Sequence, residues 1–317
     1  MRIFVDDGST NIKLAWMEEG TVKTLISPNS FKPEWSMTLQ GLDDSTVPAS
    51  ANYEIDGEKY SFDQLSPDAV RTTETRYQYS DVNVVAIHHA LMRSGIEPQP
   101  VDIVVTLPLG EYLDENDQPD LANIERKKAN VKRAVTVQGR ESFTVRKVSV
   151  LPESVPAGFS VLKDLDDLDS LLIVDIGGTT LDIAHVRSKM SGFTKTYCDP
   201  KTGVSIITEA VKHALDASVS TRTSSYFADR LIQARNDETD QRAQVMKVLH
   251  EREKALTHRV TDSVGRFAGF THVMVVGGGA SLVAGAVRQA TGVSDDRFFV
   301  SDNPQFDLVL GMVAMKG

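Results

Sequence analysis

Two short segments of this chain carry the residue types that bind phosphate groups. Each follows a short apolar run, and they read Asp6-Asp7-Gly8-Ser9-Thr10-Asn11 and Asp175-Ile176-Gly177-Gly178-Thr179-Thr180. Glycine lets backbone amides approach an anion closely, and Ser and Thr hydroxyls add further donors. One such segment is a common turn. Two copies about half a chain apart predict the two halves of one nucleotide site.

The residues of these segments divide into two expected roles. Asp6 and Asp175 end the two strands and could hold Mg²⁺ through water, since magnesium favours one or two carboxylates plus phosphate oxygens. The residues expected at the phosphates are Asp7, Gly8, Ser9, Thr10, Asn11 and Lys13 in the first half and Gly177, Gly178, Thr179 and Thr180 in the second. Lys13 could reach back to the β- or γ-phosphate or face solvent, and its spacing does not separate the two. Asp182 is expected to pin the second hairpin, or to orient water.

A third glycine cluster, Gly277-Gly278-Gly279-Ala280, ends an apolar run and opens a helical one. Glycines there could leave room for an adenine or guanine ring against the backbone, or could serve helix–strand packing. Hydrolysis also needs a group that positions water in line with the γ-phosphate. Glu153, between Pro152 and Pro156, is the candidate, although a glutamate between prolines can also be a solvated loop residue.

The bulk composition narrows the class of protein. A length of 317 residues predicts two lobes, because single cores seldom grow so large. The formal charge of −10 argues against broad direct contact with DNA or RNA, which requires clustered Lys and Arg. A single cysteine, Cys198, cannot form an internal disulfide and favours a reducing cytoplasm. No apolar run is long enough to span a membrane, and the early first strand leaves no room for a signal peptide.

Strands and helices alternate in the pattern needed to position these segments. Strands are expected over 3–5, 12–17, 21–26, 101–107, two within 134–150, 171–175, 183–187 and 272–276, and helices over 82–94, 123–132, 205–217, 225–232, 240–267, 280–290 and 307–315. Asp56-Gly57 predicts the clearest hairpin turn. Each half thus begins with an acidic–glycine hairpin and continues with strands and crossover helices. This pattern predicts an α/β protein with two related lobes.

Several other functions lack their motifs. The chain has no G-x-x-x-x-G-K-[ST] phosphate loop, no G-x-S-x-G elbow and no kinase H-R-D or D-F-G set. His88 and His89 are adjacent, which is the wrong spacing for a metal site on a helix, so we place them at the helix surface and the edge of the core. The basic residues from Arg126 to Arg133, including Lys127, are expected to form a solvated face or, second, a contact surface. Trp16 and Trp35 are expected to pack.

The order of two phosphate segments and a glycine cluster resembles the superfamily of actin, hexokinase and heat-shock-chaperone ATPases. Within it, the chain resembles the ParM (StbA) family of plasmid-segregation actins from end to end. Outside the glycine segments the likeness rests on Ser27-Pro28-Asn29-Ser30-Phe31, Tyr79-Ser80-Asp81-Val82-Asn83-Val84-Val85-Ala86, Asn123-Ile124-Glu125-Arg126-Lys127-Lys128-Ala129-Asn130 and Pro152-Glu153-Ser154-Val155-Pro156-Ala157-Gly158. The stretches 40–50 and 199–223 depart from the family pattern, which leaves filament contacts and kinetics open.

The resemblance implies a two-lobed actin-like fold, with a mixed sheet and flanking helices in each lobe and ATP or GTP with Mg²⁺ in the interlobe cleft. Lobe I would comprise residues 1–165 and the C-terminal helix at about 305–317, and lobe II residues 166–304. Glu153 and Asp175 match the family's hydrolytic pair, and Gly277, Gly278 and Gly279 match its adenosine loop. The implied partners are further copies of the chain, in a dynamic double-stranded helical filament, and a ParR-type adaptor on a centromere-like DNA site. Neither direct nucleic-acid contact nor a membrane is implied, and the setting is the bacterial cytoplasm.

Two other functions on the same fold were weighed. A small-molecule kinase of the sugar-kinase type would need an Asp base between the lobes, and every candidate Asp is already assigned to the nucleotide. A chaperone-type ATPase module is expected to continue into a substrate domain, whereas this sequence ends at Gly317. The expected activity is therefore nucleoside triphosphate hydrolysis coupled to filament dynamics.

Overall fold

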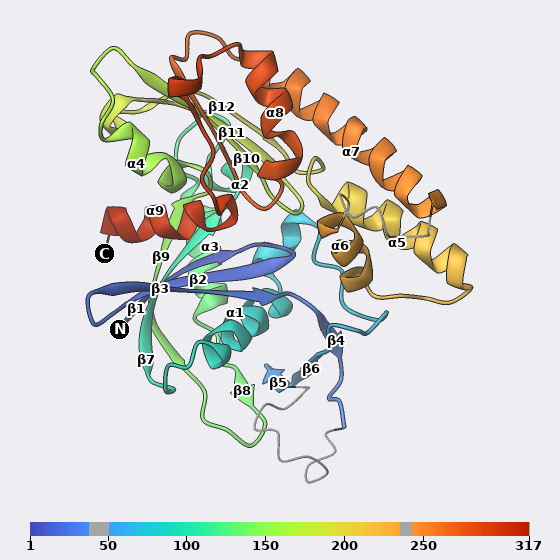
Figure 1. The fold of residues 1–317 in the computed structure, drawn as a ribbon. Coiled ribbons are helices and arrows are strands. Elements are labelled where there is room, and N and C mark those ends of the chain that lie inside the picture. Colours follow the sequence, from blue (N-terminus) through green and yellow to red (C-terminus); the bar gives the residue numbers. More distant parts are fainter. Residues whose placement is uncertain (38–50, 235–242, 317) are drawn as a thin grey trace.

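Two five-stranded sheets form the framework of the molecule (Figure 1). The computed structural model describes residues 1–37, 51–234 and 243–316. The first sheet has the order β3-β2-β1-β7-β9, with β1 (Arg2–Asp7), β2 (Asn11–Glu18), β3 (Thr21–Pro28), β7 (Pro100–Leu107) and β9 (Thr144–Pro152). The second has the order β12-β11-β10-β13-β14, with β10 (Ser170–Ile176), β11 (Leu181–Arg187), β12 (Phe193–Asp199), β13 (His272–Val276) and β14 (Phe298–Phe299).

The two sheets repeat one topology. In each, three antiparallel strands come first in the chain, and two parallel strands extend the sheet from the first of them. β10 is buried along its whole length, and β1 is buried except at Arg2. Strands covered on both faces require continuous apolar runs, which is the pattern that the sequence shows before each phosphate segment. The predicted duplication of architecture is confirmed.

A smaller sheet is attached to the first half of the chain, at the lower right of Figure 1. Its order is β4-β6-β5-β8, with β4 (Phe31–Pro33), β5 (Asn52–Ile55), β6 (Glu58–Phe62) and β8 (Thr136–Val137). The hairpin turn predicted at Asp56-Gly57 is confirmed, with φ of 48° and 89° at the two residues. The two strands predicted within 134–150 join different sheets, because β8 pairs with β5 and β9 pairs with β7. The stretch 40–50 lies outside the described residues.

Helices connect the strands and cover the sheets. They are α1 (Asp81–Arg93), α2 (Leu109–Tyr112), α3 (Leu121–Val131), α4 (Phe159–Leu162), α5 (Ser205–Val219), α6 (Ser225–Gln233), α7 (Ala243–Val264), α8 (Ala280–Thr291) and α9 (Asp307–Lys316). Short 3-10 turns are η1 (Thr75–Tyr79), η2 (Val155–Gly158), η3 (Ser188–Met190), η4 (Asp295–Arg297) and η5 (Pro304–Phe306). α1 begins at a Ser80 cap, whose Oγ accepts from the Asn83 amide at 3.3 Å, and ends before Gly95 at φ 79°. The expected start of α7, residues 240–242, lies outside the described part of the chain.

α9 lies between the two large sheets (Figure 1) and packs against η2. One apolar cluster there joins residues from both halves of the chain, among them Phe4 of β1, Ile173 of β10 and Val309 of α9. Two further clusters fill the outer side of each sheet against its own helices. The sheets are therefore connected by a continuous apolar layer, and the polar ends of β1 and β10 open onto the same side of it.

His88 and His89 lie deeper than expected. Both are buried, at 1% and 5% exposure, so their placement at the helix surface was wrong. The His89 ring stacks on Phe62 with centroids 4.2 Å apart, and its Nδ1 lies 2.7 Å from the Tyr53 hydroxyl. Burial lowers the pKa of His88 to about 4, and burial with the nearby Arg93 lowers that of His89 to about 3. Burial of neutral imidazole makes stability depend on pH.

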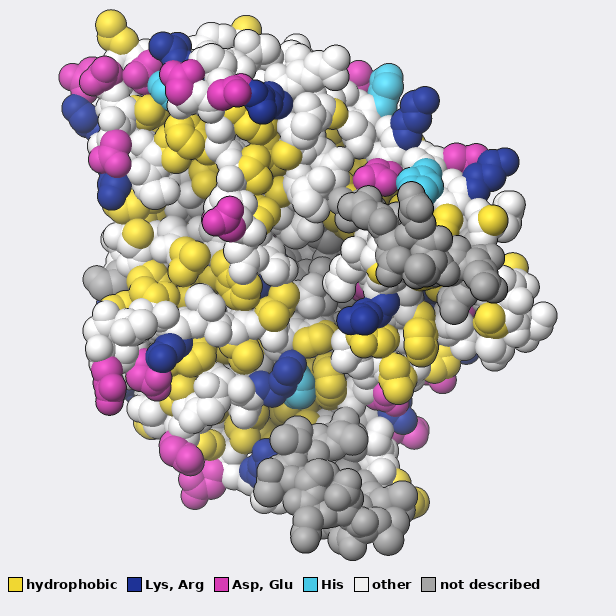
Figure 2. Space-filling model, in the orientation of Figure 1, with side chains coloured by type: hydrophobic (Ala, Val, Ile, Leu, Met, Phe, Trp, Pro, Cys, Tyr) yellow, Lys and Arg dark blue, Asp and Glu magenta, His cyan; other side chains and the backbone are white. Residues whose placement is uncertain are grey.

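The described helices include none that is long and apolar enough to cross a membrane. On the face drawn in Figure 2, Lys and Arg side chains are interspersed with Asp and Glu and do not form one basic surface. This distribution gives no support on that face to a direct nucleic-acid contact.

His88→Leu is expected to weaken the pH dependence of stability. A histidine whose folded-state pKa is lowered stabilises the fold above its unfolded pKa of about 6.5, and that stability is lost as the pH falls. Between pH 7 and pH 5 the loss from His88 amounts to about 2 kcal/mol. Urea unfolding at both pH values should show the variant losing that much less than the parent. A matched loss in both would contradict the prediction, and exposed His250→Leu is the control.

Candidate nucleotide site

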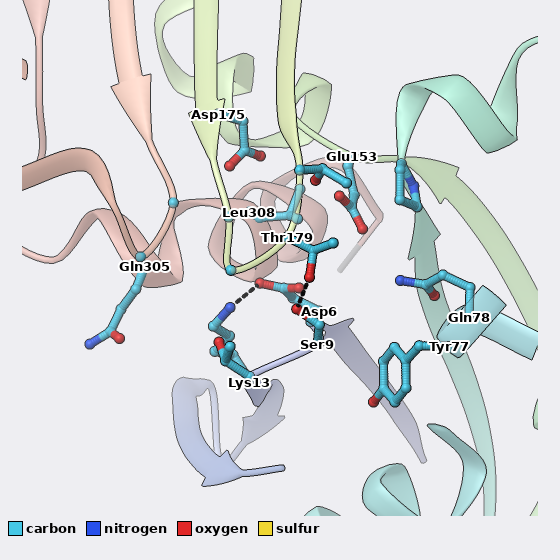
Figure 3. A pocket seen from close by; sticks show the side chains of 18 of the residues that line it. Asp6, Ser9, Lys13, Tyr77, Gln78, Glu153, Asp175, Thr179, Gln305 and Leu308 are labelled. Carbon is cyan, nitrogen blue, oxygen red and sulfur yellow. Dashed lines mark hydrogen bonds and ion pairs between the residues drawn. The ribbon is translucent and has the colours of Figure 1, made fainter. Parts of the chain in front are cut away.

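The two phosphate segments meet through Ser9 and Thr179 (Figure 3). The hydroxyls of Ser9 and Thr179 lie 2.6 Å apart, which joins the β1–β2 turn to the β10–β11 turn. A side chain at Gly178 would place its Cβ 2.7 Å from Cγ2 of Thr10 and 3.0 Å from Oγ of Ser9. Glycine at 178 is therefore required for the two turns to approach this closely.

One cavity collects most of the residues that the sequence singled out. Its lining includes Asp6, Gly8, Ser9, Thr10, Lys13, Glu153, Asp175, Gly177, Gly178, Thr179, Thr180, Gly277 and Gly278. Asp7, Asn11 and Gly279 were also predicted, but they do not line it. Figure 3 shows Asp6, Glu153 and Asp175 reaching in from separate elements, β1, the end of β9 and β10.

Asp7 points away from the cavity to a buried lysine on α3. Lys127 is fully buried, and its Nζ donates to Oδ2 of Asp7, to the Gln78 carbonyl at 2.9 Å and to Asn83 Oδ1 at 3.1 Å. The placement of Lys127 on a solvated face was therefore wrong. Burial lowers the pKa of Lys127, and the Asp7 carboxylate opposes that shift. The pair anchors the strand end that precedes the first phosphate segment to α1 and α3.

Lys13 faces the cavity and is paired. The register of the first hairpin places Lys13 directly opposite Asp6, and its Nζ lies 2.8 Å from Oδ2 of Asp6. Burial alone would lower the pKa of Lys13, but the Asp6 carboxylate and then Asp175 and Glu153 raise it above its ordinary value. Lys13 is the one cation among the described residues of the lining. It is thus a charged donor where the cavity is otherwise acidic.

The carboxylates of the cavity repel one another. Burial, then Asp182 and Asp6, raises the pKa of Asp175 to about 8. Burial and the same neighbours raise the pKa of Glu153 well above its usual range. Asp182 lies opposite Asp175 in the hairpin register, and its Oδ1 accepts from the Leu109 amide at 2.9 Å, which caps α2. Asp182 also hydrogen-bonds Thr180 of its own hairpin and Cys198 of β12, so it holds the hairpin as expected and α2 in addition.

This charge balance fits a divalent cation. Asp6, Glu153 and Asp175 line the cavity against Lys13, so carboxylates are in excess in a poorly solvated space, whereas Glu74 at its edge is paired with Arg76. Among the described residues, no three His, Cys, Asp or Glu side chains come close enough to hold a metal directly. The arrangement suits Mg²⁺ held by water and phosphate oxygens near Asp6 and Asp175, since magnesium retains several waters.

The three glycines after β13 have different surroundings. Gly277 has φ of 89°, and a Cβ there would come within 2.5 Å of Oδ1 of Asp175. Gly278 faces open space and lines the cavity. A Cβ at Gly279 would meet Val204 at 2.7 Å, so this glycine serves helix–strand packing. The packing role is thus seen at Gly279, and a place for a purine ring beside Gly277 and Gly278 stays a prediction.

Several residues that line the cavity lie outside any motif recognised in the sequence. Tyr77 and Gln78 come from η1, and Pro304, Gln305 and Leu308 come from η5 and α9 (Figure 3). Behind the first turn, the carbonyl of Ser9 accepts from Asn29 Nδ2 at 3.0 Å and from Thr72 Oγ1 at 2.6 Å. These residues lie in segments far apart in the chain. Only Asn29 belongs to a stretch that the family resemblance had marked.

Two family models cover nearly the whole chain. The model described as plasmid segregation protein ParM, N-terminal, matches residues 1–164, and that described as ParM, C-terminal, matches residues 165–315. The chain belongs to the ParM family. No curated protein sequence matches this ParM-family chain.

Solved structures agree with the fold. A 15-stranded ParM filament from Clostridium botulinum is 16% identical, with 99% of this chain and 98% of that one covered and a TM-score of 0.72. The pCBH ParM non-polymerisable quadruple mutant is 17% identical, with the same coverage and a TM-score of 0.71. Ta0583, an archaeal actin homologue in complex with ADP, is 16% identical over both full chains, with a TM-score of 0.72. At these identities the likeness establishes the two-lobed actin-like fold.

Lys127→Met is expected to destabilise this ParM-family protein by about 3–5 kcal/mol, because it leaves the buried Asp7 carboxylate without its cation. Chemical denaturation measures the loss. Lys128→Met is the matched control, since Lys128 pairs with Glu125 at the surface and should change stability by less than about 1 kcal/mol. Adding Asp7→Asn to Lys127→Met should recover part of the loss. Equal effects of the two lysine variants would disprove the buried pair.

Gly178→Ala is expected to weaken nucleotide binding about tenfold or more, because the added Cβ forces the two turns apart. Titration calorimetry with ATP and Mg²⁺ measures the change. Gly285→Ala in α8 is the control, since a Cβ there meets nothing within 4 Å, and it should leave affinity unchanged. An unchanged affinity for Gly178→Ala would show that the contact does not govern the site.

Proposed function

We propose that this ParM-family protein binds ATP or GTP with Mg²⁺, hydrolyses it and couples hydrolysis to the growth and decay of a filament that segregates plasmid DNA. The observation that carries the proposal is the meeting of two phosphate-binding turns from the two sheets beside Glu153 and Asp175. The family match and the ParM filament among the similar structures support it. We infer from the plasmid context that the protein works in the bacterial cytoplasm.

Phosphates in the cavity would be held by both halves of the chain. Backbone amides and hydroxyls of Ser9 and Thr10 face those of Thr179 and Thr180, and Lys13 supplies the positive charge. A ligand held from both sides favours the closed arrangement of the lobes over an open one. A shift from mostly open to mostly closed requires about 3–5 kcal/mol of differential binding. Loss of the γ-phosphate would remove part of that preference and weaken contacts between subunits.

The hydrolytic roles fall to Glu153 and Asp175. Glu153 accepts a hydrogen bond from water and orients it toward the γ-phosphate. Asp175, with Asp6, would hold the water shell of a bound cation, and Gly277 and Gly278 leave space beside it for the nucleoside. Mg²⁺, when bound, neutralises charge on the phosphate oxygens.

The partners follow from the family. We infer further copies of the chain in a double-stranded helical filament and a ParR-type adaptor that links the filament end to a centromere-like DNA site. The net charge of −10 supports DNA contact through the adaptor alone.

Glu153→Ala should slow hydrolysis at least about 100-fold while assembly persists, because the water-orienting carboxylate is lost and the phosphate-binding turns are kept. Right-angle light scattering and phosphate release are followed in one cuvette after ATP and Mg²⁺ are added. The parent should scatter and then decay as phosphate appears, and the variant should scatter without decay. Exposed Glu115→Ala is the control. Normal phosphate release from Glu153→Ala would remove Glu153 from the mechanism, and flat scattering of the parent would exclude a filament.

A further inference from the structure

The backbone directly after Glu153 adopts a rare conformation. Ser154 has φ of 69° and ψ of −52°, and the Val155 amide donates to the Glu153 carbonyl at 2.8 Å. A hydrogen bond from residue i+2 to residue i with positive φ defines the strained form of the γ-turn. Ser154 is fully buried, so water does not stabilise this conformation. Strained backbone of this kind persists only where its surroundings hold it.

The surroundings hold the turn on three sides. Before it, the Glu153 amide donates to the Leu107 carbonyl at 2.8 Å, which ties Glu153 to the end of β7. After it, a Cβ at Gly158 would lie 2.5 Å from Cδ1 of Ile173 in β10, so the chain is pressed against the second sheet. On the remaining side, α9 lies so close that a Cβ at Gly311 would overlap the Pro156 carbonyl. The turn is thus clamped between the two sheets and α9.

The clamp also reaches the nucleotide cavity. α9 contributes Leu308 to the cavity lining, one turn before Gly311 reaches the segment that follows Ser154. One helix therefore contacts both the space for the ligand and the backbone that carries Glu153. Because α9 and β10 hold the chain at Pro156 and Gly158, a change to an ordinary backbone conformation at Ser154 has to be absorbed by the peptide next to it, which would displace Glu153.

We propose that Ser154 is a positioning residue for hydrolysis: its strained γ-turn, clamped by Gly311 of α9 and by β10, aims the Glu153 carboxylate into the cavity. This proposal rests on the proposed role of Glu153 in hydrolysis. It adds that the orientation of the Glu153 carboxylate depends on the backbone conformation at Ser154, which α9 maintains. We expect the effect of Ser154 on hydrolysis to pass through Glu153. The Ser154 side chain also contacts the Asp175 carboxylate, so ATP affinity is measured for every variant.

Two substitutions at Ser154 separate conformation from chemistry. Ser154→Thr keeps the hydroxyl but is β-branched, and β-branched residues strongly disfavour positive φ. Ser154→Gly loses the side chain but adopts positive φ without strain. We expect the Thr variant to release phosphate from ATP and Mg²⁺ about 10- to 100-fold more slowly, because a displacement of about 1 Å is sufficient for such a loss. The Gly variant should stay within about threefold of the parent, and both should bind ATP with the parental affinity.

The decisive measurement repeats Ser154→Thr in a Glu153→Ala background. If Ser154 acts through Glu153, the substitution has no further effect on the residual rate of phosphate release. An equal loss in both backgrounds, a parallel loss of ATP affinity, or a Gly variant as slow as the Thr variant would overturn the proposal. If the Thr variant does not fold, a slow but folded Gly variant overturns it, and a Gly variant near the parental rate supports it. Parental hydrolysis by Glu153→Ala alone would instead disprove the role of Glu153, which is a separate outcome.

Discussion

The contact between the two phosphate-binding turns is the constraint on which the site depends. Ser9 and Thr179 touch through their hydroxyls, and Gly178 lets the turns approach without a side chain between them. Neither turn encloses a cavity alone, since each is a short connection between two strands of one sheet. The apolar layer that joins the two sheets brings both ends to the same place. A change in how the lobes sit against each other therefore changes the site directly.

Burial of charge accounts for much of the remaining architecture. The two aspartates that end β1 have separate uses: Asp6 pairs with Lys13 in the cavity, and Asp7 pairs with Lys127 behind it. In the second sheet, Asp175 has no lysine opposite it and faces Asp182 instead, and burial, followed by Asp182, raises its pKa to about 8. The site thus stays acidic on one side, where a cation and phosphates complete the charge balance. The first hairpin thus carries aspartates paired with lysines, and the second carries Asp175, which has no such partner opposite it.

Some features of the fold follow from neighbouring residues, and others depend on partners that are distant in the chain. The hairpins, the apolar strands and the Gly95 helix end follow from local pattern, because each depends on neighbours in the chain. The division of the two strands within 134–150 between two sheets does not follow from local pattern, because a strand can pair with any free sheet edge of the fold. Lys127 shows the same limit for a side chain. It stands among other basic residues in a polar helix, and only its position toward Asp7 distinguishes it from Lys128.

The sequence by itself determined the two acidic–glycine hairpins, the alternation of strands and helices, and the family. It also determined most of the cavity lining, because those residues lie at strand ends that must converge in this fold. The tertiary structure alone decided that Asp7 serves Lys127, that Asp182 caps α2, that Gly279 packs and that His88 is buried. Each of these depends on a partner far away in the chain, and composition and spacing carry no information about which distant groups meet when the lobes close on a shared apolar layer.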